Sequence, residues 1–370
     1  MSSATETPLR ASPFRVEPRL DPKPWGSRGL ERFGFPLPPD TPIGEALLTA
    51  HEARLHDGPL AGVQLGTLMA ADPSGIAGRR GLAATGNLPL FPLLVKLIDA
   101  AENLSIQVHP NDEAARSVNR LGKTEAWHVV SALPEAVLFV GLRSGVSVPT
   151  FRTVCRQGGP TSDYLRRIPA IPGTTILIPA GTVHAIGAGV LMYEVQQPSD
   201  VTYRLDDWGR VDAEGRPRDL HLDAGSAAID PENRPDAIPP VSVGLTGGRR
   251  LLAACRYFAL EQLVLGTGEE EPLGLAAPES PQVVTCLQGD VTVTANDAAT
   301  PLTLGETIVI PAAAGNARVR AIVPSVLLRT WVPDLESEVV QPARAMGATN
   351  DAIMALAGGL PDITKVIKRL

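Results

Sequence analysis

The sequence lacks the features that mark membrane proteins and disulfide-rich secreted proteins. It contains three cysteines, Cys155, Cys255 and Cys286, which lie far apart and form no Cys-x-x-Cys pair. Neither a disulfide framework nor a thiolate zinc site is therefore predicted. No run of about 18 apolar residues indicates a membrane span, and the first residues have no apolar stretch typical of a secretion signal. We expect a cytoplasmic protein with reduced cysteines and no membrane partner.

Positive charge and aromatic residues are also scarce. The chain has 33 Lys and Arg against 40 Asp and Glu, a formal net charge of -7, and only 4% aromatic residues. Nucleic-acid binding normally needs an excess of basic side chains, so we expect no nucleic-acid partner. Glycine and proline are abundant, at 35 residues each among 370. This composition favours a fold of many short strands joined by turns over a helical bundle.

Short runs of β-branched and apolar residues, separated by Gly, Pro and Asn, predict strands in the first half of the chain. They are LLVKLIDA (93–100), SIQVHP (105–110), AWHVVSAL (126–133), AVLFVGL (136–142), TTILIPA (174–180) and VLMYEVQQ (190–197). FRTVCRQGG and SDYLRRIP, within 151–169, favour short helices. Residues 14–92 mix short apolar runs with loops and predict no clear secondary structure.

One internal repeat indicates the architecture. The segment GTTILIPAGTVH begins at Gly173, and GETIVIPAAAGN begins at Gly305, an offset of 132 residues. Both have glycine followed six residues later by proline, but His184 of the first copy is replaced by Asn316 in the second. The first copy resembles the second motif of the cupin superfamily, whose double-sheet jelly roll holds a metal between its sheets. Two copies imply a mainly β protein with two cupin-type jelly-roll domains, a bicupin, and a few short helices.

The domain boundaries follow from this repeat and from composition. Because Asn316 stands where the first copy has His184, the second domain is predicted to bind no metal. The predicted segments are 1–13, a disordered terminus; 14–230, a catalytic cupin domain with the metal site; 231–249, a Pro- and Gly-rich linker; 250–338, a metal-free cupin domain; and 339–370, a C-terminal tail of helical character. No function is predicted for the tail.

A metal site is predicted from four residues of the first domain. Gln107 and His109 are two apart on a predicted strand, so both side chains point to the same face. Glu125 and His184 complete a set of two imidazole nitrogens and two oxygen donors. Such a set suits zinc or another borderline divalent metal, with positions left for water or substrate. The remaining histidines are expected to be core or surface residues: His51, His56, His128 and His221.

Several longer strings resemble one enzyme family. LVKLIDAAENLSIQVHPND, GKTEAWHVV and PAGTVHAIGAGVLMYEVQQPSDVTYRLDDWGR, with the early PWG and IGE, closely resemble the type I mannose-6-phosphate isomerases over roughly residues 14–335. The short stretch between Glu125 and His184 is similar to the compact bacterial form. The resemblance implies an isomerase of mannose metabolism that interconverts mannose 6-phosphate and fructose 6-phosphate, with one zinc ion per chain on Gln107, His109, Glu125 and His184.

The resemblance also implies roles for further residues. The reaction moves a proton between C1 and C2 of the sugar through an enediolate. By resemblance, the catalytic residues are Arg204, Lys123 and Glu194, and the residues that bind the phosphorylated substrate are Ser105, Lys96 and Arg210. The group that removes the C2 proton is left open among Lys123, Glu194 and a water on the metal.

Two departures from the family pattern leave other hypotheses open. Leu47 and Asp206 stand where the family usually has aromatic residues, so the sugar preference is not fixed. One alternative is an isomerase of a related free or phosphorylated sugar. A second is a non-catalytic sugar-phosphate-binding bicupin, which the retained metal ligands disfavour. A third is an iron-dependent cupin dioxygenase. The sequence predicts no oligomeric state.

Overall fold

The protein is described by a computed structural model that covers residues 12–212, 214–245, 248–274, 279–296 and 298–370. Residues 1–11 of the predicted disordered terminus lie outside the described residues. In the described ranges the strands form four sheets, and all strand pairs within them are antiparallel. The prediction of a mainly β protein is confirmed. Among the described residues, no helix is both long and apolar enough to cross a membrane.

Two of the sheets face each other around a core that includes Trp127, Leu138 and Met192. The six-stranded sheet has the order β10-β7-β12-β5-β3-β2. Its strands are β2 (Arg19–Ser27), β3 (Ile43–Thr49), β5 (Leu94–Ala100), β7 (Glu125–Ala132), β10 (Thr175–Ile178) and β12 (Val190–Gln196). The five-stranded sheet contains β13 (Tyr203–Asp206), β6 (Ile106–Val108), β11 (His184–Ile186), β8 (Val137–Leu142) and β9 (Leu165–Pro169), in that order. All six strands predicted from apolar runs are present.

The other two sheets enclose a second core that includes Leu263, Val291 and Ile308. The eight-stranded sheet contains β14 (Val241–Ser242), β15 (Arg249–Ala254), β16 (Ala259–Leu265), β23 (Ser325–Trp331), β18 (Gln282–Gln288), β21 (Thr307–Ile310), β1 (Phe14–Glu17) and β4 (Arg54–Leu55), in that order. The four-stranded sheet contains β17 (Glu270–Pro272), β22 (Arg318–Ala321), β19 (Asp290–Ala295) and β20 (Ala298–Thr303).

The first strand of the chain does not join the first pair of sheets. Phe14 of β1 pairs with Val309 of β21, so residues 14–17, predicted to open the catalytic domain, are hydrogen bonded into the eight-stranded sheet. The predicted linker 231–249 likewise contributes β14 to the edge of this sheet. Both segments therefore connect the two pairs of sheets.

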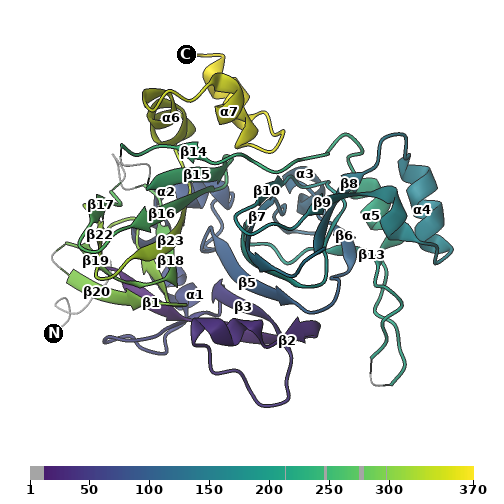
Figure 1. The fold of residues 1–370 in the computed structure, drawn as a ribbon, viewed down its shortest axis with the longest axis horizontal. Helices are drawn as coiled ribbons and strands as arrows, with labels where there is room; N and C mark the ends of the chain where they lie inside the picture. Colours follow the sequence, from purple (N-terminus) through teal and green to yellow (C-terminus); the bar gives the residue numbers. More distant parts are fainter. Residues whose placement is uncertain (1–11, 213, 246–247, 275–278, 297) are drawn as a thin grey trace.

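The six-stranded and eight-stranded sheets pack back to back (Figure 1). Alternate residues of each strand serve different cores, as the period of two in a strand requires. Tyr193 of β12 and Val283 of β18 lie in one shared core, whereas their neighbours Met192 and Val284 face the cores inside each pair of sheets. The described residues thus form four layers of sheet with four cores. The largest core joins the two halves, and the fourth lies between the five-stranded sheet and the helices α4 (Val148–Arg156) and α5 (Leu222–Ala228).

Short helices cover the edges. They are α1 (Leu65–Ala71), α2 (Pro73–Ala84), α3 (Asp112–Arg116), α4 (Val148–Arg156) and α5 (Leu222–Ala228), with the 3-10 turns η2 (Gly29–Phe33) and η3 (Thr161–Tyr164). The helix predicted in FRTVCRQGG is α4. The helix predicted in SDYLRRIP is wrong beyond η3, because Leu165–Pro169 pairs with β8 as strand β9 and alternates between buried and more exposed positions.

The C-terminal tail is helical and packs on the shared core. It contains the π-helical turn η4 (Glu336–Val340), α6 (Gln341–Ala345), α7 (Asn350–Ala355) and α8 (Asp362–Ile367). Val339, Ile353 and Ile363 are fully buried members of that core. The tail lies at the top of the molecule, over the junction of the two halves (Figure 1).

Candidate active site

Three side chains of the first pair of sheets form a buried cluster. Within the described part of the chain, His109, Glu125 and His184 are the one group of metal-ligand types whose ligand atoms all lie within 4.8 Å of one another. Nε2 of His109 is 3.4 Å from Oε2 of Glu125, and Nε2 of His184 is 3.4 Å from Oε1. Both Glu125 oxygens are buried without a hydrogen-bond partner. A bare buried carboxylate is costly, so these atoms fit a bound cation.

The strands bring these residues together from distant parts of the sequence. Glu125 begins β7, and His184 begins β11, where it pairs with Gln107 of β6. His109 follows β6 directly. Nε2 of Gln107 lies 3.2 Å from Nε2 of His184, and a rotation of this amide would present its oxygen to the same point. The structure therefore brings three of the predicted metal ligands, His109, Glu125 and His184, to one position, with the Gln107 amide next to His184.

The outer nitrogens of the two histidines are fixed by the backbone. Nδ1 of His109 lies 2.9 Å from the Val201 carbonyl oxygen, and Nδ1 of His184 lies 2.9 Å from that of Thr182. When Nδ1–H donates to a carbonyl, Nε2 keeps its lone pair for a metal. Burial lowers the pKa of both rings, that of His109 to about 3, where Lys123 adds to the effect. Both imidazoles are thus neutral near pH 7, which is the metal-binding form.

Lys123 is the cation next to this cluster. Its Nζ lies 3.1 Å from Nε2 of His109 and 3.4 Å from Oε2 of Glu125, and the side chain is buried. Burial opposes ionisation of Glu125, but Lys123 foremost holds the pKa of this carboxyl well below its usual range. The carboxylate is therefore ionised at neutral pH and available as a ligand.

A second set of charges crosses the six-stranded sheet, and we call it the ionic row. Lys96 of β5 lies between Glu45 of β3, at 3.6 Å, and Glu194 of β12, at 3.5 Å. Glu194 also accepts a hydrogen bond of 3.0 Å from the Trp127 indole. Burial, with a contribution from Glu125, raises the pKa of Glu194. Burial alone would lower the pKa of Lys96, but the neighbouring carboxylates outweigh this effect, so the pKa of Lys96 is raised.

The eight-stranded sheet contains the counterpart of this row with reversed charges. Its strand order β21-β18-β23-β16-β15 matches β10-β7-β12-β5-β3. Glu194 and Arg329 occupy equivalent positions in register, as do Lys96 and Glu261. Arg329 donates to Glu261 at 2.9 Å and to Gln282, the counterpart of Glu125, at 2.7 Å. In the second half, a buried arginine network thus takes the place of the ionic row, and Gln282 stands where the metal cluster has Glu125.

A cavity of about 730 Å³ opens beside the cluster. Its walls include Leu47 and several basic and polar side chains: Lys23, Lys96, Ser105, Gln107, Lys123, Arg204 and Arg218. This lining gives an otherwise acidic protein a local excess of positive charge where an anion would enter. Glu194, expected to be catalytic, is not among the lining residues and lies behind Lys96, a placement that favours a role in orienting Lys96.

Of the two arginines predicted for the site, Arg204 lies at the cavity and Arg210 does not. Arg204 pairs with Gln107 across β13 and β6 and lines the cavity. Arg210, expected to bind substrate, instead donates to Asp207 at 2.6 Å and lines a neighbouring hollow with Asp206. Arg218, which the sequence reasoning missed, lines the cavity and donates to the same Asp207 at 2.7 Å. No motif includes Arg218, because it reaches the cavity from the long loop between β13 and α5 (Figure 1).

Comparison with known proteins identifies a family for this arrangement. A sequence model of the phosphomannose isomerase type I catalytic domain matches residues 14–128. The mannose-6-phosphate isomerase ManA of Bacillus subtilis (strain 168) is 35% identical over 234 residues, which are 62% of this chain and 71% of the relative. The chain belongs to the type I phosphomannose isomerase family.

Other mannose-6-phosphate isomerases agree with this result. The mannose-6-phosphate isomerase of Streptococcus mutans serotype c is 35% identical over 218 residues, 58% of this chain and 66% of the relative. The crystal structure of the mannose 6-phosphate isomerase from Bacillus subtilis superposes with a TM-score of 0.73 at 28% identity, covering 86% of this chain and 99% of that chain. The resemblance predicted from sequence is confirmed, and the cluster of His109, Glu125 and His184 is the candidate metal centre of this phosphomannose isomerase.

Proposed function

We propose that this protein is a zinc-dependent aldose-ketose isomerase that interconverts mannose 6-phosphate and fructose 6-phosphate. The observation that carries the proposal is the Glu125 carboxylate, which is buried without hydrogen-bond partners between two imidazole Nε2 atoms at the edge of a basic cavity. A site of this kind can hold a divalent cation between its nitrogen and oxygen donors and an anionic sugar beside it. Membership of the phosphomannose isomerase family supplies the reaction.

Gln107, His109, Glu125 and His184 would hold the metal. Their nitrogen and oxygen donors, with no thiolate among the four, suit zinc. When bound, the metal supplies Lewis-acid stabilisation of the charge that develops on the sugar oxygens in the enediolate.

Lys123 is our candidate for moving the proton between C1 and C2. Its Nζ is within 3.4 Å of two of the proposed ligands, lines the cavity and is fixed in a buried place. Arg204 lines the same cavity, and its buried Nε has no hydrogen-bond partner. As a cation in the cavity wall, with Nη1 held by the Asp219 carbonyl oxygen at 3.0 Å, the guanidinium would stabilise negative charge on the substrate.

Lys96, Ser105 and Arg218 are our candidates for contact with the phosphorylated end of the sugar. A phosphate carries close to two negative charges near neutral pH. All three side chains line the cavity beside the cluster. Glu194 and Glu45 keep Lys96 protonated and hold it between β3 and β12. Arg210 stays with Asp207 and would act on the cavity only through that carboxylate.

A coupled assay for mannose 6-phosphate turnover tests the proposal. Purified protein is measured as prepared, after chelation, and after addition of Zn²⁺ or other divalent ions, with free mannose as a parallel substrate. We expect turnover of the phosphorylated sugar to disappear on chelation and to return with zinc. Turnover of free mannose alone would favour the free-sugar isomerase. Binding of sugar phosphate without turnover in the metal-loaded protein would favour the binding-protein hypothesis.

A further inference from the structure

One carboxylate links the proposed active site to the second half of the molecule. Asp112 is the first residue of α3 and follows the ligand His109 closely in sequence. Its Oδ1 accepts hydrogen bonds from the Gly122 amide and from Nε2 of Gln197, both at 3.0 Å. Its Oδ2 accepts from the Tyr257 hydroxyl and, at 3.3 Å, from Arg256. Both oxygens are thus fully used, each toward a different half.

The donors on Oδ1 fix the backbone on both sides of Lys123. The Gly122 amide is hydrogen bonded to Asp112 directly. On the other side of Lys123, the Thr124 amide donates to Oε1 of Gln197 at 2.9 Å, and the Gln197 backbone amide donates to the Thr124 carbonyl at 3.1 Å. The approach at Gly122 is so close that a Cβ there would lie 2.6 Å from the Asp112 nitrogen. Lys123 therefore stands on a segment that Asp112 helps to fix, together with the Pro110 carbonyl oxygen, which accepts from the Lys123 amide at 3.2 Å.

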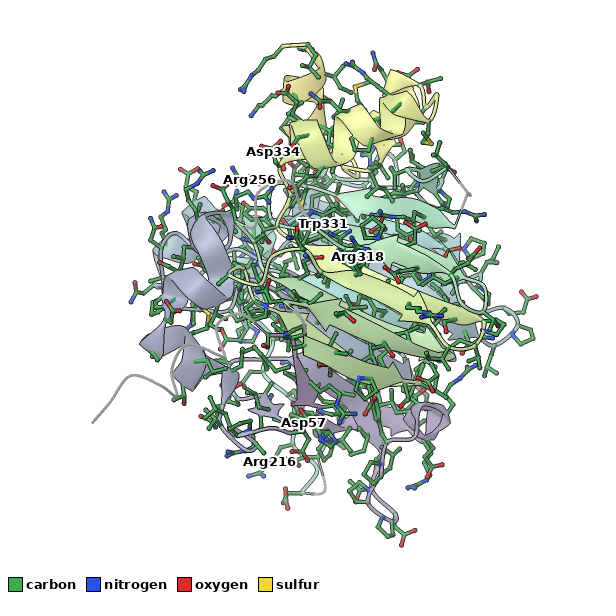
Figure 2. All side chains as sticks on the ribbon, turned by 90° about the vertical axis from the view of Figure 1, so that its left-hand side faces the viewer. Asp57, Arg216, Arg256, Arg318, Trp331 and Asp334 are labelled. Carbon is green, nitrogen blue, oxygen red and sulfur yellow. The ribbon has the colours of Figure 1, made fainter. Side chains whose placement is uncertain are left out.

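The donors on Oδ2 come from the turn between β15 and β16. The Arg256 guanidinium lies 4.6 Å from the centre of the Tyr257 ring. The C-terminal tail holds this turn, because the Arg256 amide donates to Asp362 of α8 at 3.0 Å and the Ala254 amide donates to the Leu356 carbonyl at 2.9 Å. Figure 2 shows Arg256 below the C-terminal helices.

We propose that Asp112 is a positioning residue, through which the β15–β16 turn and the C-terminal tail hold Lys123 in its place beside the metal ligands. The inference rests on the proposed function, because it assigns Asp112 an effect on proton transfer by Lys123. A lysine has a long flexible stem, so its Nζ is placed accurately only when its backbone is fixed. Displacing a reacting group by about 1 Å can lower a rate by about 100-fold.

The first experiment compares steady-state kinetics of Asp112→Ala and Tyr257→Phe with the zinc-loaded wild type. We expect kcat to fall about tenfold or more for Asp112→Ala and about threefold for Tyr257→Phe, because the second change removes a single hydroxyl donor. KM and bound zinc should stay near wild-type values, since neither residue lines the cavity beside the cluster. Glu113→Ala, which removes an exposed carboxylate from the same helical turn, and Tyr164→Phe are matched controls expected to retain wild-type kcat.

A background test separates positioning from general damage. If Asp112 acts through Lys123, Asp112→Ala should lower the residual kcat of a Lys123→Ala protein by less than twofold, because coupled residues are not additive. A full tenfold loss of kcat in the Lys123→Ala background would overturn the inference. So would a loss of bound zinc in Asp112→Ala that is proportional to its loss of kcat.

Hydrogen exchange tests, without turnover, whether Asp112 fixes the backbone around Lys123. The amides of Gly122 and Thr124 should exchange faster in Asp112→Ala and in Tyr257→Phe than in wild type, and unchanged exchange would overturn the proposal. A wild type that binds zinc but leaves mannose 6-phosphate unconverted would refute the proposed function, whereas an active wild type with an equally active Asp112→Ala protein would refute this inference alone.

Discussion

At the scale of residues, the site depends on the negative charge of Glu125. This carboxylate faces two neutral imidazoles and one lysine, and its oxygens have no hydrogen-bond donors of their own. Its charge is thus available to attract a divalent ion in competition with Lys123.

Glu125→Gln keeps the shape of this side chain but removes its charge. We expect the bound metal per chain to fall to a small fraction of the wild-type value and kcat/KM to drop by at least about 100-fold, in keeping with the loss of a direct ligand. Metal analysis by mass spectrometry, together with the coupled assay, checks both effects. The control is His128→Gln, because His128 lies on the same strand as Glu125 but its side chain contacts Thr175. This variant should keep its metal, and loss of metal from it would contradict the assignment of Glu125 as a ligand.

His128 also provides a pH test of burial. Burial lowers the pKa of His128 to about 4 from 6.5. Between these values the unfolded chain binds a proton that the folded chain does not, so stability is lost as the pH falls. From pH 7 to 4.5 we expect the free energy of unfolding of wild type to fall by on the order of 2 kcal/mol more than that of His128→Gln. Urea unfolding at both pH values measures this difference, and parallel curves for the two proteins would refute it.

At the scale of elements, the matching strand orders explain which parts of the sequence could be interpreted. The strands β5, β7, β8 and β12 were predicted because both faces of each are buried, which leaves uninterrupted apolar runs. Strand β9 was not, because its sequence LRRIP has two consecutive arginines, one on each face of the strand, which interrupt the apolar pattern. The strands β1 and β4 are short and pair with partners far along the chain, so no local pattern marks them.

Site residues in local motifs could likewise be predicted, and residues brought in from distant parts of the chain could not. His109, Glu125 and His184 lie in local motifs, and the sequence indicated each of them. Arg218 and Tyr257 lie near the site only because the chain folds back from another loop and from the other half. The position of Glu194 behind Lys96 is likewise a matter of packing depth, which strand alternation alone does not fix.

Arg329 holds together neighbouring strands of the eight-stranded sheet, and replacing it tests how much its buried network stabilises the protein. It is 2% exposed and bonds Glu261 of β16 and Gln282 of β18, with a further bond of 2.9 Å to the Leu273 carbonyl. Arg329→Met leaves these acceptors buried and only partly paired, so we expect the free energy of unfolding to fall by about 3–5 kcal/mol.

The matched control is Arg318→Met, which removes the exposed ion pair with Glu270. Arg318 is labelled in Figure 2. Its expected cost is below about 1 kcal/mol. Denaturant unfolding measures both changes, and equal losses in the two variants would contradict the buried role of Arg329.

At the scale of the whole molecule, the two halves share their largest core and the C-terminal tail completes it. Glu338 of η4 accepts hydrogen bonds from Arg80 of α2 at 2.8 Å and from the Trp331 indole at 3.0 Å. The apolar side chains of η4, α7 and α8 are buried against both halves. The tail is therefore part of the folded unit.

Deleting residues 335–370 should therefore destabilise the entire protein. Each fully buried Val, Leu or Ile of the tail contributes about 1.5–3 kcal/mol, and several are lost together. We expect the thermal midpoint to fall by at least about 10 °C or the protein to become insoluble. Thermal unfolding followed by circular dichroism measures this, with deletion of 368–370 as the control. A truncated protein with wild-type stability would show that the tail is dispensable.

The pairing of β1 with β21 has a consequence for how the protein is made. Arg15 and Glu306, which bond at 2.7 Å, are 291 residues apart in the chain. At a synthesis rate of about 5–20 residues per second, the first strand leaves the ribosome on the order of 15–60 s before its partner exists. Throughout that interval the edge of β1 that pairs with β21 stays open, so this early strand is among the last to find its native place.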